Sequence, residues 1–329
     1  MRTFARYALS NGAAAALLAA CGGSQPLIGA SGAMAQSRAV ATRSERGAAP
    51  SYLYVADAST QQPAIVAFDV AGNKVAEKRF KSDGGGPVDV VTDSRGHVYA
   101  IVYDKARNSP VIEYTHNLDR QIAEYHPPGY STTMTIDAAD NLYVESDTGS
   151  ENIVRYRYGS TRVDHTYSIV SGPPDEMLGI SVRGNTLYTL IAYVNSNPPD
   201  LLIQCDIKGA KPCNYYNGPT NLLCGFTTAN QDYVYAPQVT DADEIRYVTI
   251  GGSFEKNGHD MRLPAGYGFN TGNCIFHSYG DDVWVTLHGD SQPAAAAEID
   301  LHRKVVKRMI GGGYLDNPQA AYYGNGFTP

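Results

Sequence analysis

"VDVVTDSRGHVYAIVYD" (88–104) begins with an apolar run, turns through Asp, Arg and Gly, and continues in a second apolar run that opens with Val-Tyr. "TMTIDAADNLYVESD" (133–147) repeats the same order of residue types. Alternation with a period of two, together with abundant Val, Ile and Tyr, favours β-strands. Asp and Gly between two such runs favour a tight turn. Each segment therefore predicts a β-hairpin.

The hairpin pattern returns in "LGISVRGNTLYTLIAY" (178–193), "CGFTTANQDYVYAPQV" (224–239) and "NCIFHSYGDDVWVTLH" (273–288). One anchor aromatic opens the second strand each time, at spacings of 44, 45, 47 and 49 residues. These anchors are Tyr99, Tyr143, Tyr188, Tyr235 and Trp284. A third and a fourth strand follow each pair, as in "PVIEYT" (110–115) and "LDRQIAEYH" (118–126). Four short strands in each repeat are typical of a β-propeller blade.

The two ends of the repeat region complement each other. Residues 51–80 contain only the second, third and fourth strands of a blade, with Tyr54 in the anchor position. The C-terminal "PQAAYYGNG" (318–326) supplies a first strand. We therefore predict an all-β, six-bladed β-propeller of four-stranded antiparallel blades, in which the C-terminal strand joins the N-terminal blade and removes two sheet edges. The other blades are expected at 86–126, 130–170, 175–216, 220–263 and 268–310. A β-sandwich or a seven-bladed ring with one degenerate blade would leave the matching ends unexplained.

The repeats "DSRGHVYA" (93–100) and "DAADNLYVE" (137–145) resemble those of the NHL and YncE-like bacterial propellers, and more loosely the six-bladed SMP-30/gluconolactonase group. The resemblance covers about 51–329 and implies a fold rather than a chemistry. In the SMP-30 group, Glu, Asn and Asp side chains hold a divalent ion that activates lactone hydrolysis. Glu176 with Asn221 or Asn273 would be the nearest analogue, but the flanking residues do not match that family's motifs.

The first twenty residues are typical of an export signal, with Arg2 and Arg6 before a short apolar stretch. The stretch ends in "LAAC" (18–21), which resembles a bacterial lipobox. Cleavage before Cys21 and acylation of its thiol would anchor the protein to the membrane, facing the periplasm or the cell exterior. We predict a signal peptide at 1–20, a lipid-anchored flexible tether at 21–50 and the propeller at 51–329. The alternative is an ordinary signal peptide that is cut after "SGAMA" (31–35).

The five cysteines fit an exported protein if Cys21 carries lipid and the other four form two disulfides. Cys205 and Cys213 lie on either side of a predicted turn, so a cross-strand bond between them is plausible. Cys224 and Cys274 occupy nearly equivalent places on the first strands of adjacent blades, where a bond would join two blades. Buried free thiols or a thiolate metal site are the alternatives, and the sequence leaves the connectivity open.

The net charge of −7 and the pI of about 5.6 argue against nucleic-acid binding. The sequence has no H-E-x-x-H pair, nucleophile elbow, P-loop or dinucleotide fingerprint. We therefore expect a monomeric, non-catalytic binding or scaffold module outside the cytoplasm that needs no cofactor, with an envelope protein or a glycan as its partner. The alternative is a lactonase-like, metal-dependent hydrolase or lyase with Ca²⁺ or another divalent ion at the channel mouth.

Propeller geometry places the links between blades and the loops after each second strand on one face. Binding groups tend to lie on such loops above a rigid scaffold. Polar residues just before or within the innermost strands should line the channel mouth on this face. They are Asp89, Thr132, Asp175, Glu176, Asn221, Asn273 and Asn317. Oxygen ligands of this kind suit Ca²⁺, with Glu176, Asn221 and Asn273 as the metal candidates, although hydrated polar channels are common. His288, Tyr103, Tyr130, Tyr193 and Tyr267 also fall near this face.

Overall fold

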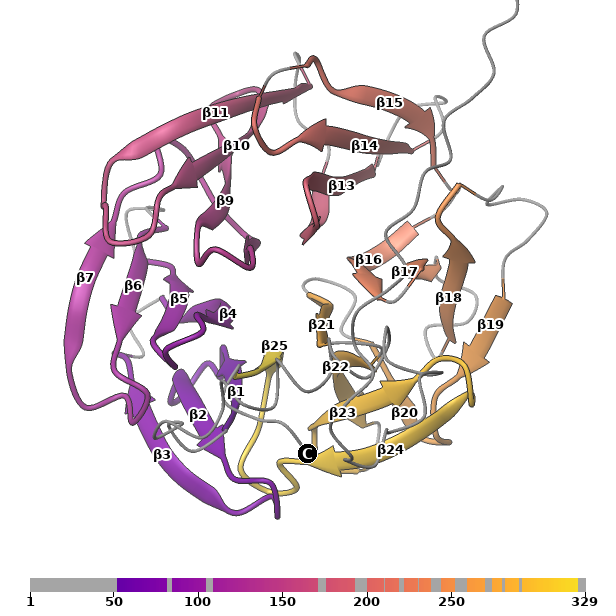
Figure 1. Cartoon of the computed structure of the whole chain (residues 1–329). Coiled ribbons are helices and arrows are strands. Elements are labelled where there is room, and N and C mark those ends of the chain that lie inside the picture. Colours follow the sequence, from indigo (N-terminus) through magenta and orange to yellow (C-terminus); the bar gives the residue numbers. More distant parts are fainter. Residues whose placement is uncertain are drawn as a thin grey trace, which may run out of the picture. The chain divides into compact units, whose positions relative to one another are not determined.

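The computed structural model describes residues 52–81, 85–104, 109–170, 176–192, 200–209, 211–218, 222–229, 231–237, 244–251, 259–269, 274–279, 282–289 and 292–324. The described residues form six antiparallel sheets, which are arranged as blades around a ring (Figure 1). All regular elements within these ranges are strands. The described residues therefore contain no helix long and apolar enough to cross a membrane. The predicted all-β, six-bladed propeller is confirmed. The predicted signal peptide and tether lie outside the described residues.

Each of the first three blades runs from an innermost to an outermost strand. Blade 1 contains, in that order, β25 (Pro318–Tyr323), β1 (Leu53–Asp57), β2 (Ala64–Phe68) and β3 (Lys74–Arg79). Blade 2 contains β4 (Pro87–Thr92), β5 (Val98–Val102), β6 (Val111–Tyr114) and β7 (Gln121–Tyr125). Blade 3 contains β8 (Met134–Ile136), β9 (Leu142–Asp147), β10 (Glu151–Tyr156) and β11 (Val163–Val170).

The last three blades follow in chain order. Blade 4 contains β12 (Glu176–Arg183), β13 (Thr186–Ala192), β14 (Leu201–Asp206) and β15 (Asn214–Asn217). Blade 5 contains β16 (Leu222–Ala229), β17 (Asp232–Pro237), β18 (Glu244–Thr249) and β19 (His259–Arg262). Blade 6 contains β20 (Tyr267–Gly268), β21 (His277–Tyr279), β22 (Asp282–Gly289), β23 (Ala295–Asp300) and β24 (Val305–Ile310).

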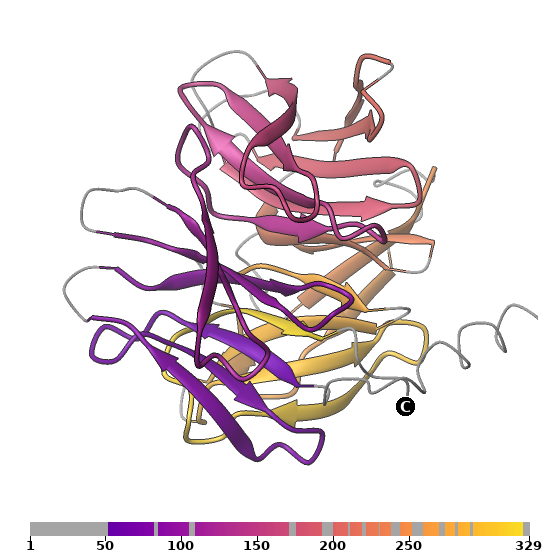
Figure 2. The ribbon, with the colours of Figure 1, turned by 60° about the vertical axis from the view of Figure 1, so that its left-hand side comes forward.

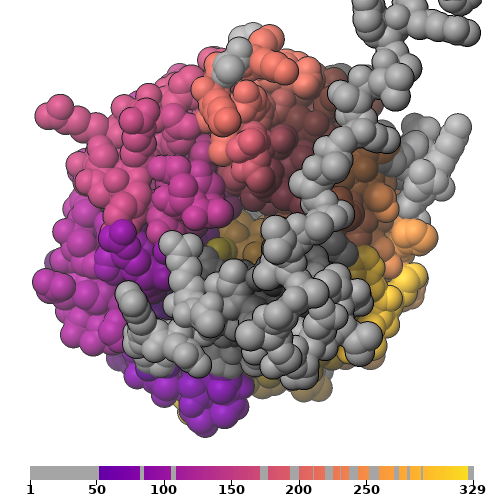
Figure 3. Space-filling view, in the orientation of Figure 1, coloured from indigo at the N-terminus to yellow at the C-terminus, as the bar shows by residue number. Residues whose placement is uncertain are grey.

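Blade 1 is shared between the two ends of the described chain, as the sequence predicts. β25 pairs with β1 in a register that places Tyr323 opposite Leu53 and Pro318 opposite Asp57. In both ribbon views the yellow C-terminal strands lie beside the indigo N-terminal strands (Figure 1, Figure 2). The space-filling view shows the blade colours following one another around the ring from indigo to yellow (Figure 3). The ring is therefore closed by pairing within one sheet.

In blades 2 and 3 an Asp six residues before the anchor aromatic organises the hairpin turn. Asp137 Oδ1 accepts hydrogen bonds from the Ala139 and Asn141 N–H groups, at 2.8 and 2.9 Å. The hydroxyl of Tyr143 donates to the other oxygen at 3.0 Å, which connects the turn to the anchor. Asp93 makes the same backbone contacts in blade 2. The turn also needs a left-handed residue, which is Asp140 (φ 63) in blade 3 and Gly96 (φ 83) in blade 2.

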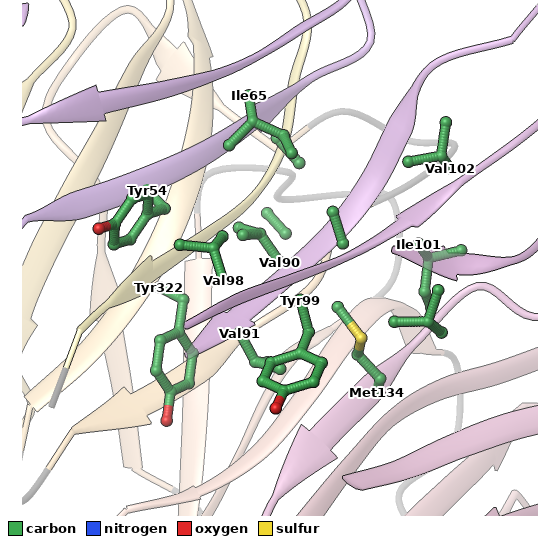
Figure 4. Close-up of a cluster of buried hydrophobic side chains, with 14 of the residues drawn as sticks. Tyr54, Ile65, Val90, Val91, Val98, Tyr99, Ile101, Val102, Met134 and Tyr322 are labelled. Atoms are coloured by element: carbon green, nitrogen blue, oxygen red, sulfur yellow. The ribbon is translucent and has the colours of Figure 1, made fainter. Parts of the chain in front are cut away.

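The anchor aromatics fill the spaces between blades. Tyr54, Tyr99 and Tyr143 are 2%, 2% and 0% exposed. Figure 4 shows one such cluster, in which Tyr54 and Tyr99 lie among Val90, Val98 and other aliphatic side chains from blades 1 and 2. Met134 of blade 3 also joins this cluster. Each blade therefore buries its apolar faces against its neighbours, and the core is spread around the ring.

The innermost strands are interrupted near one end of the ring. Register shifts between the inner and the second strand occur in four of the described sheets, with one extra inner-strand residue in blades 1, 2 and 4 and two in blade 5. The extra residues are Gln319, Val88, Leu178, Leu223 and Gly225. Such bulges bend a strand and redirect its side chains. They recur at the same end of the inner strands.

Blade 6 departs from the simple pattern. Its inner position is divided between β20 and β21, which both pair with β22. The residue before β21 leaves its own sheet: Ile275 forms a parallel bridge with Ala320 of β25, and its N–H donates to the carbonyl of Gln319 at 3.1 Å. Blade 6 is thus joined to the closing strand by backbone as well as by side chains.

Candidate functional site

One end of the sheets carries both the loop after the second strand and the link that enters the next inner strand. Backbone hydrogen bonds of 2.9 Å join these segments, from Ala58 to Asn317, from Tyr103 to Gly86 and from Tyr130 to Asp147. We call this end the link face and the opposite end the turn face. The bulges of the inner strands lie at the link face, and this is the face on which the sequence analysis expects the binding groups.

Glu145 on β9 lies at the link-face end of blade 3 and is 3% exposed. Its Oε2 accepts hydrogen bonds from the Thr132 N–H at 2.6 Å, the Thr133 N–H at 3.2 Å and the Thr132 hydroxyl. Burial raises the pKa of Glu145 to about 7, although these hydrogen bonds favour the carboxylate and oppose the shift. Glu145 therefore gains and loses its proton close to neutral pH.

Asp89 on β4 is fully buried and connects several blades at the axis. Its Oδ1 lies 2.7 Å from His277 Nε2 of blade 6 and accepts the Val90 N–H, also at 2.7 Å. Its Oδ2 accepts the N–H of Met134 in blade 3 at 2.7 Å. Burial raises the pKa of Asp89, and the contacts with His277 and the two N–H groups oppose this shift. The His277 ring also packs edge-on against Tyr322 of blade 1, with centroids 5.1 Å apart. Four consecutive blades therefore meet around one carboxylate.

Consecutive backbone N–H groups at the start of blade 3 donate to side chains. Ser131 N–H donates to Ser109 Oγ at 2.7 Å, and the next two N–H groups donate to Glu145. The N–H of Met134 donates to Asp89. Two buried acids thus hold neighbouring amides of one inner strand. This arrangement places Asp89 and Thr132, both selected from the sequence, at one site together with Glu145.

Glu145 was missed by the sequence analysis because only the innermost strands were searched for channel residues. The signal lies in the repeat itself. Glu145 follows its anchor aromatic by two positions, and the corresponding residues of the other blades carry no acid. They are Ala56, Ile101, Leu190, Pro237 and Thr286. A carboxyl at a position that is otherwise apolar or uncharged could have been recognised by aligning the second strands.

A tyrosine pair covers this part of the link face. The rings of Tyr103 and Tyr130 pack with centroids 5.0 Å apart, and Tyr130 is 38% exposed. Burial raises the pKa of Tyr103, and the neighbouring Tyr130 and then the acids Glu145 and Asp89 raise it further. Its hydroxyl therefore remains protonated and able to donate. Tyr267 is half-buried on β20, and Tyr193 lies outside the described residues.

Buried polar atoms without a hydrogen-bond partner among the described residues gather near the link face. They include Thr133 Oγ1, Ser146 Oγ, Gln319 Oε1 and His288 Nε2. Such an atom costs about 1–3 kcal/mol when nothing satisfies it, so in native proteins it marks a position where water or a ligand binds. Burial lowers the pKa of His288, although a hydrogen bond to the Pro318 carbonyl opposes the shift. The imidazole is therefore neutral at pH 7 and offers a lone pair at Nε2.

Asn317 supports the closing blade at the same face. Its N–H donates to Asp57 Oδ1 at 2.7 Å, and its side-chain oxygen accepts Nε2 of Gln319 at 2.9 Å. Asp57 also accepts the Asp316 N–H at 3.2 Å, and burial raises the pKa of Asp57. Asn317 thus orients the bulged Gln319, whose Oε1 has no described partner.

Several residues selected from the sequence cannot be assigned to this site. Asp175, Asn221 and Asn273 lie outside the described residues, and only the backbone of Glu176 is described, in β12. The proposed metal ligands are therefore not placed relative to one another. Among the described residues, no group of three or more His, Cys, Asp or Glu side chains is arranged to hold a metal ion.

Some of the predicted cysteine roles fall within the described residues, and others fall outside them. Cys205 and Cys213 form the predicted cross-strand disulfide, with Cα atoms 4.3 Å apart. Cys274 is 3% exposed and is disulfide-bonded. The side chain of Cys224 lies outside the described residues, so its pairing with Cys274 stays a prediction. Cys21, the predicted lipid attachment site, also lies outside them.

The raised pKa of Glu145 predicts a specific pH dependence of stability. Since the folded-state pKa exceeds the usual value of 4.5, this stabilisation is complete below about pH 4.5 and is lost as the pH rises through about 7. Glu145→Gln keeps the shape and stays neutral. We compare the free energy of unfolding of Glu145→Gln with that of the wild type at each pH. The difference should change in favour of the variant by about 3 kcal/mol from pH 4.5 to pH 8, because only the wild type loses this stabilisation. Urea unfolding of both proteins at the two pH values measures the change. Glu124→Gln, at an exposed position, should show no such change, and parallel curves for Glu145→Gln would contradict the assignment.

The comparisons with known proteins show the fold. The sequence matches no protein-family model and no curated protein. The structure is similar to a chain in a crystal structure of a nidogen/laminin complex, with a TM-score of 0.57 and 10% identity over 83% of this chain and 98% of that one. It is also similar to a Bacteroides caccae protein of unknown function, with a TM-score of 0.58 and 12% identity over 84% and 99% of the two chains. TolB from Acinetobacter baumannii is similar as well, with a TM-score of 0.57 and 9% identity over 83% of this chain and 66% of that one.

Proposed function

We propose that this protein is a non-catalytic binding module, tethered outside the cytoplasm by lipid on Cys21, and that its link face receives a protein partner. The observation that carries the proposal is the set of unsatisfied buried polar atoms at this face, where the acids Glu145 and Asp89 also lie. A propeller does not need these atoms to close its ring. They have hydrogen-bonding capacity that a ligand can use.

The chemistry of the site favours a partner that donates hydrogen bonds and carries positive charge. Gln319 Oε1 and His288 Nε2 are acceptors, and Glu145 is an acid that ionises near neutral pH. The exposed ring of Tyr130 adds a surface over which a Lys or Arg side chain can pack. We therefore propose a basic segment of an envelope protein as the ligand. The similarity to a chain in a nidogen/laminin complex supports a protein as the kind of partner.

Cross-linking in cells tests the proposal. A photo-reactive benzoylphenylalanine at position 130 should form a discrete adduct with an envelope protein, because Tyr130 is exposed on the link face. The same amino acid at Val163, which is 42% exposed on outer strand β11, is the matched control. Glu145→Gln should reduce the adduct at position 130 several-fold by removing the acid. The absence of an adduct, or an adduct that is equal at both positions and insensitive to Glu145, would overturn the proposal.

The lipid anchor has a separate test. Cys21→Ser removes the thiol that would be acylated, so the variant should move from the membrane fraction to the soluble fraction. Fractionation followed by immunoblotting measures the shift, with Cys205→Ser and Cys213→Ser together as a control that removes thiols elsewhere. Continued membrane association of the Cys21→Ser protein would contradict lipid anchoring, and it would leave the link-face proposal in place.

A further inference from the structure

Glu145 is a buried acid without a basic partner. The residue is 3% exposed, and no Lys, Arg or His among the described residues forms an ion pair with it. Two other buried glutamates do have such partners. Glu113 Oε1 lies 3.0 Å from His97 Nδ1, and Glu298 Oε1 lies 2.8 Å from Lys307 Nζ. A buried carboxylate without a counter-charge is unfavourable. Glu145 is therefore stable as the neutral acid, or beside a cation that the described residues do not supply.

The two carboxyl oxygens of Glu145 have different surroundings. Oε2 accepts three hydrogen bonds, from the Thr132 N–H, the Thr132 hydroxyl and the Thr133 N–H. No group in the described part of the chain donates to Oε1. A carboxyl oxygen has about two lone-pair sites, so an oxygen with three donors has none left for a proton of its own. The neutral acid therefore carries its proton on Oε1.

The described titratable groups around Glu145 favour this protonated form. Asp147 follows Glu145 by two positions on β9, which places both side chains on one face of the strand. Burial raises the pKa of Glu145 to about 7, the hydrogen bonds to Oε2 oppose the shift, and charge repulsion from Asp147 adds to it. The other groups are Asp89 of β4 with its partner His277 of β21, and the tyrosine pair of Tyr103 and Tyr130.

We propose that Glu145 Oε1 exchanges its proton for a positive charge of the partner, so that protonation of this acid and binding at the link face exclude each other. The inference rests on the proposed function and adds the regulation of the same site. When the partner binds, the O–H bond at Oε1 breaks, the proton passes to water, and the carboxylate pairs with a Lys or Arg side chain of the partner. Oε2 keeps its three hydrogen bonds in both states, so the exchange needs no rearrangement of β9.

The exchange gives binding a defined pH dependence. Half of the acid is ionised at about pH 7, so about nine-tenths is ionised at pH 8 and about one-tenth at pH 6. The affinity for the partner should therefore fall about ten-fold from pH 8 to pH 6. In Glu145→Gln the affinity should be low and constant, because the amide does not ionise. Lys and Arg side chains of the partner keep their charge over this range.

Cross-linking at controlled pH measures this dependence. The full chain carries benzoylphenylalanine at position 130, and cell envelopes are solubilised in mild detergent, diluted below saturation and illuminated at pH 6 and pH 8. The adduct should be about ten-fold more abundant at pH 8, and Glu145→Gln should give the small pH 6 amount at both values. Glu124→Gln, at an exposed position on β7, should keep the wild-type dependence. Equal adduct at both pH values in the wild type, or the same pH dependence in Glu145→Gln, would overturn this inference and leave the proposed function in place. No adduct at either pH would overturn both.

Infrared spectroscopy of the purified full chain tests the proton itself and needs no partner. The difference between the wild-type spectrum and that of Glu145→Gln at pH 6 should contain a carboxylic acid C=O band, which disappears with a midpoint near pH 7. Asp89 is present in both proteins, so its contribution cancels. A difference spectrum without this band at pH 6, or a band that persists at pH 9, would overturn the inference whatever the cross-linking at position 130 shows.

Discussion

Deletion of residues 314–329 is expected to abolish cooperative folding of the propeller. The deletion removes β25, whose six residues are all buried and which is the inner strand of blade 1. β1 then loses its partner along one edge, and blade 6 loses the backbone contacts between Ile275 and β25. A domain of this kind has a net stability of only about 5–15 kcal/mol, so the loss of a fully buried inner strand removes a large fraction of it.

Circular dichroism with thermal unfolding measures the result, and the deleted chain should show no sharp transition. A milder variant probes the same junction. Tyr323 is 2% exposed and stacks on Trp284, with centroids 5.6 Å apart and planes 8° apart. The Arg308 guanidinium lies 5.3 Å from both ring centroids. Truncation of a large buried aromatic costs about 3–5 kcal/mol, and we expect Tyr323→Ala to lose a similar amount.

Tyr314→Ala is the matched control, because this tyrosine is 57% exposed. It should change the free energy of unfolding by less than about 1 kcal/mol. Addition of a synthetic 314–329 peptide to the deleted chain should partly restore the transition if β25 acts as an inserted strand. A deleted chain that keeps the wild-type melting temperature would contradict closure of the ring by β25.

Asp89→Ala is expected to have the second-largest effect, a loss of about 3–5 kcal/mol in the free energy of unfolding. The carboxylate is 0% exposed, and its removal leaves His277 and the Met134 N–H buried without their acceptor. Three inner strands lose a common contact at once. Urea unfolding at pH 7 measures the loss, because the midpoint and the slope together give the free energy.

Asp89→Asn distinguishes charge from shape. An amide has one accepting oxygen, so it can satisfy the N–H on one side while its NH₂ group faces a donor on the other. We expect a loss between those of wild type and Asp89→Ala. Asp69→Ala, in an exposed turn of blade 1, removes a carboxyl that binds only its own turn and should cost about 1 kcal/mol. Equal losses for Asp69→Ala and Asp89→Ala would show that Asp89 does not join the blades.

The architecture was predictable because its determinants are local and repeated. Asp137, the left-handed Asp140 and Tyr143 lie within seven positions of one another, and their hydrogen bonds build the hairpin of blade 3. Asp93 makes the same backbone contacts in blade 2. Closure by β25 was predictable for a related reason, since an incomplete blade at one end of the repeats requires a strand from the other end. The divided inner strand of blade 6 was not predictable, because Ile275 pairs with another blade rather than with its own.

The site was predictable only in part. Asp89 could be selected because it lies on an inner strand, and Thr132 and Asn317 because they precede one. Their roles could not be predicted, since the contact between Asp89 and His277 spans 188 residues and two blade boundaries. The alternation of apolar and polar residues in the sequence also does not reveal the extra residues in the inner strands. A bulge shifts the register by one position and therefore changes which side chains face the axis.

The shared blade has a consequence for biosynthesis. Ala58 and Asn317, which meet at the link face, are separated by 259 residues. At a typical synthesis rate of about 5–20 residues per second, β25 is synthesised on the order of tens of seconds after β1. During that time its apolar edge is open to other chains. The contacts that complete the ring also have the greatest sequence separation, which slows folding. The yield of folded protein therefore depends on protecting the N-terminal blade until the last strand emerges.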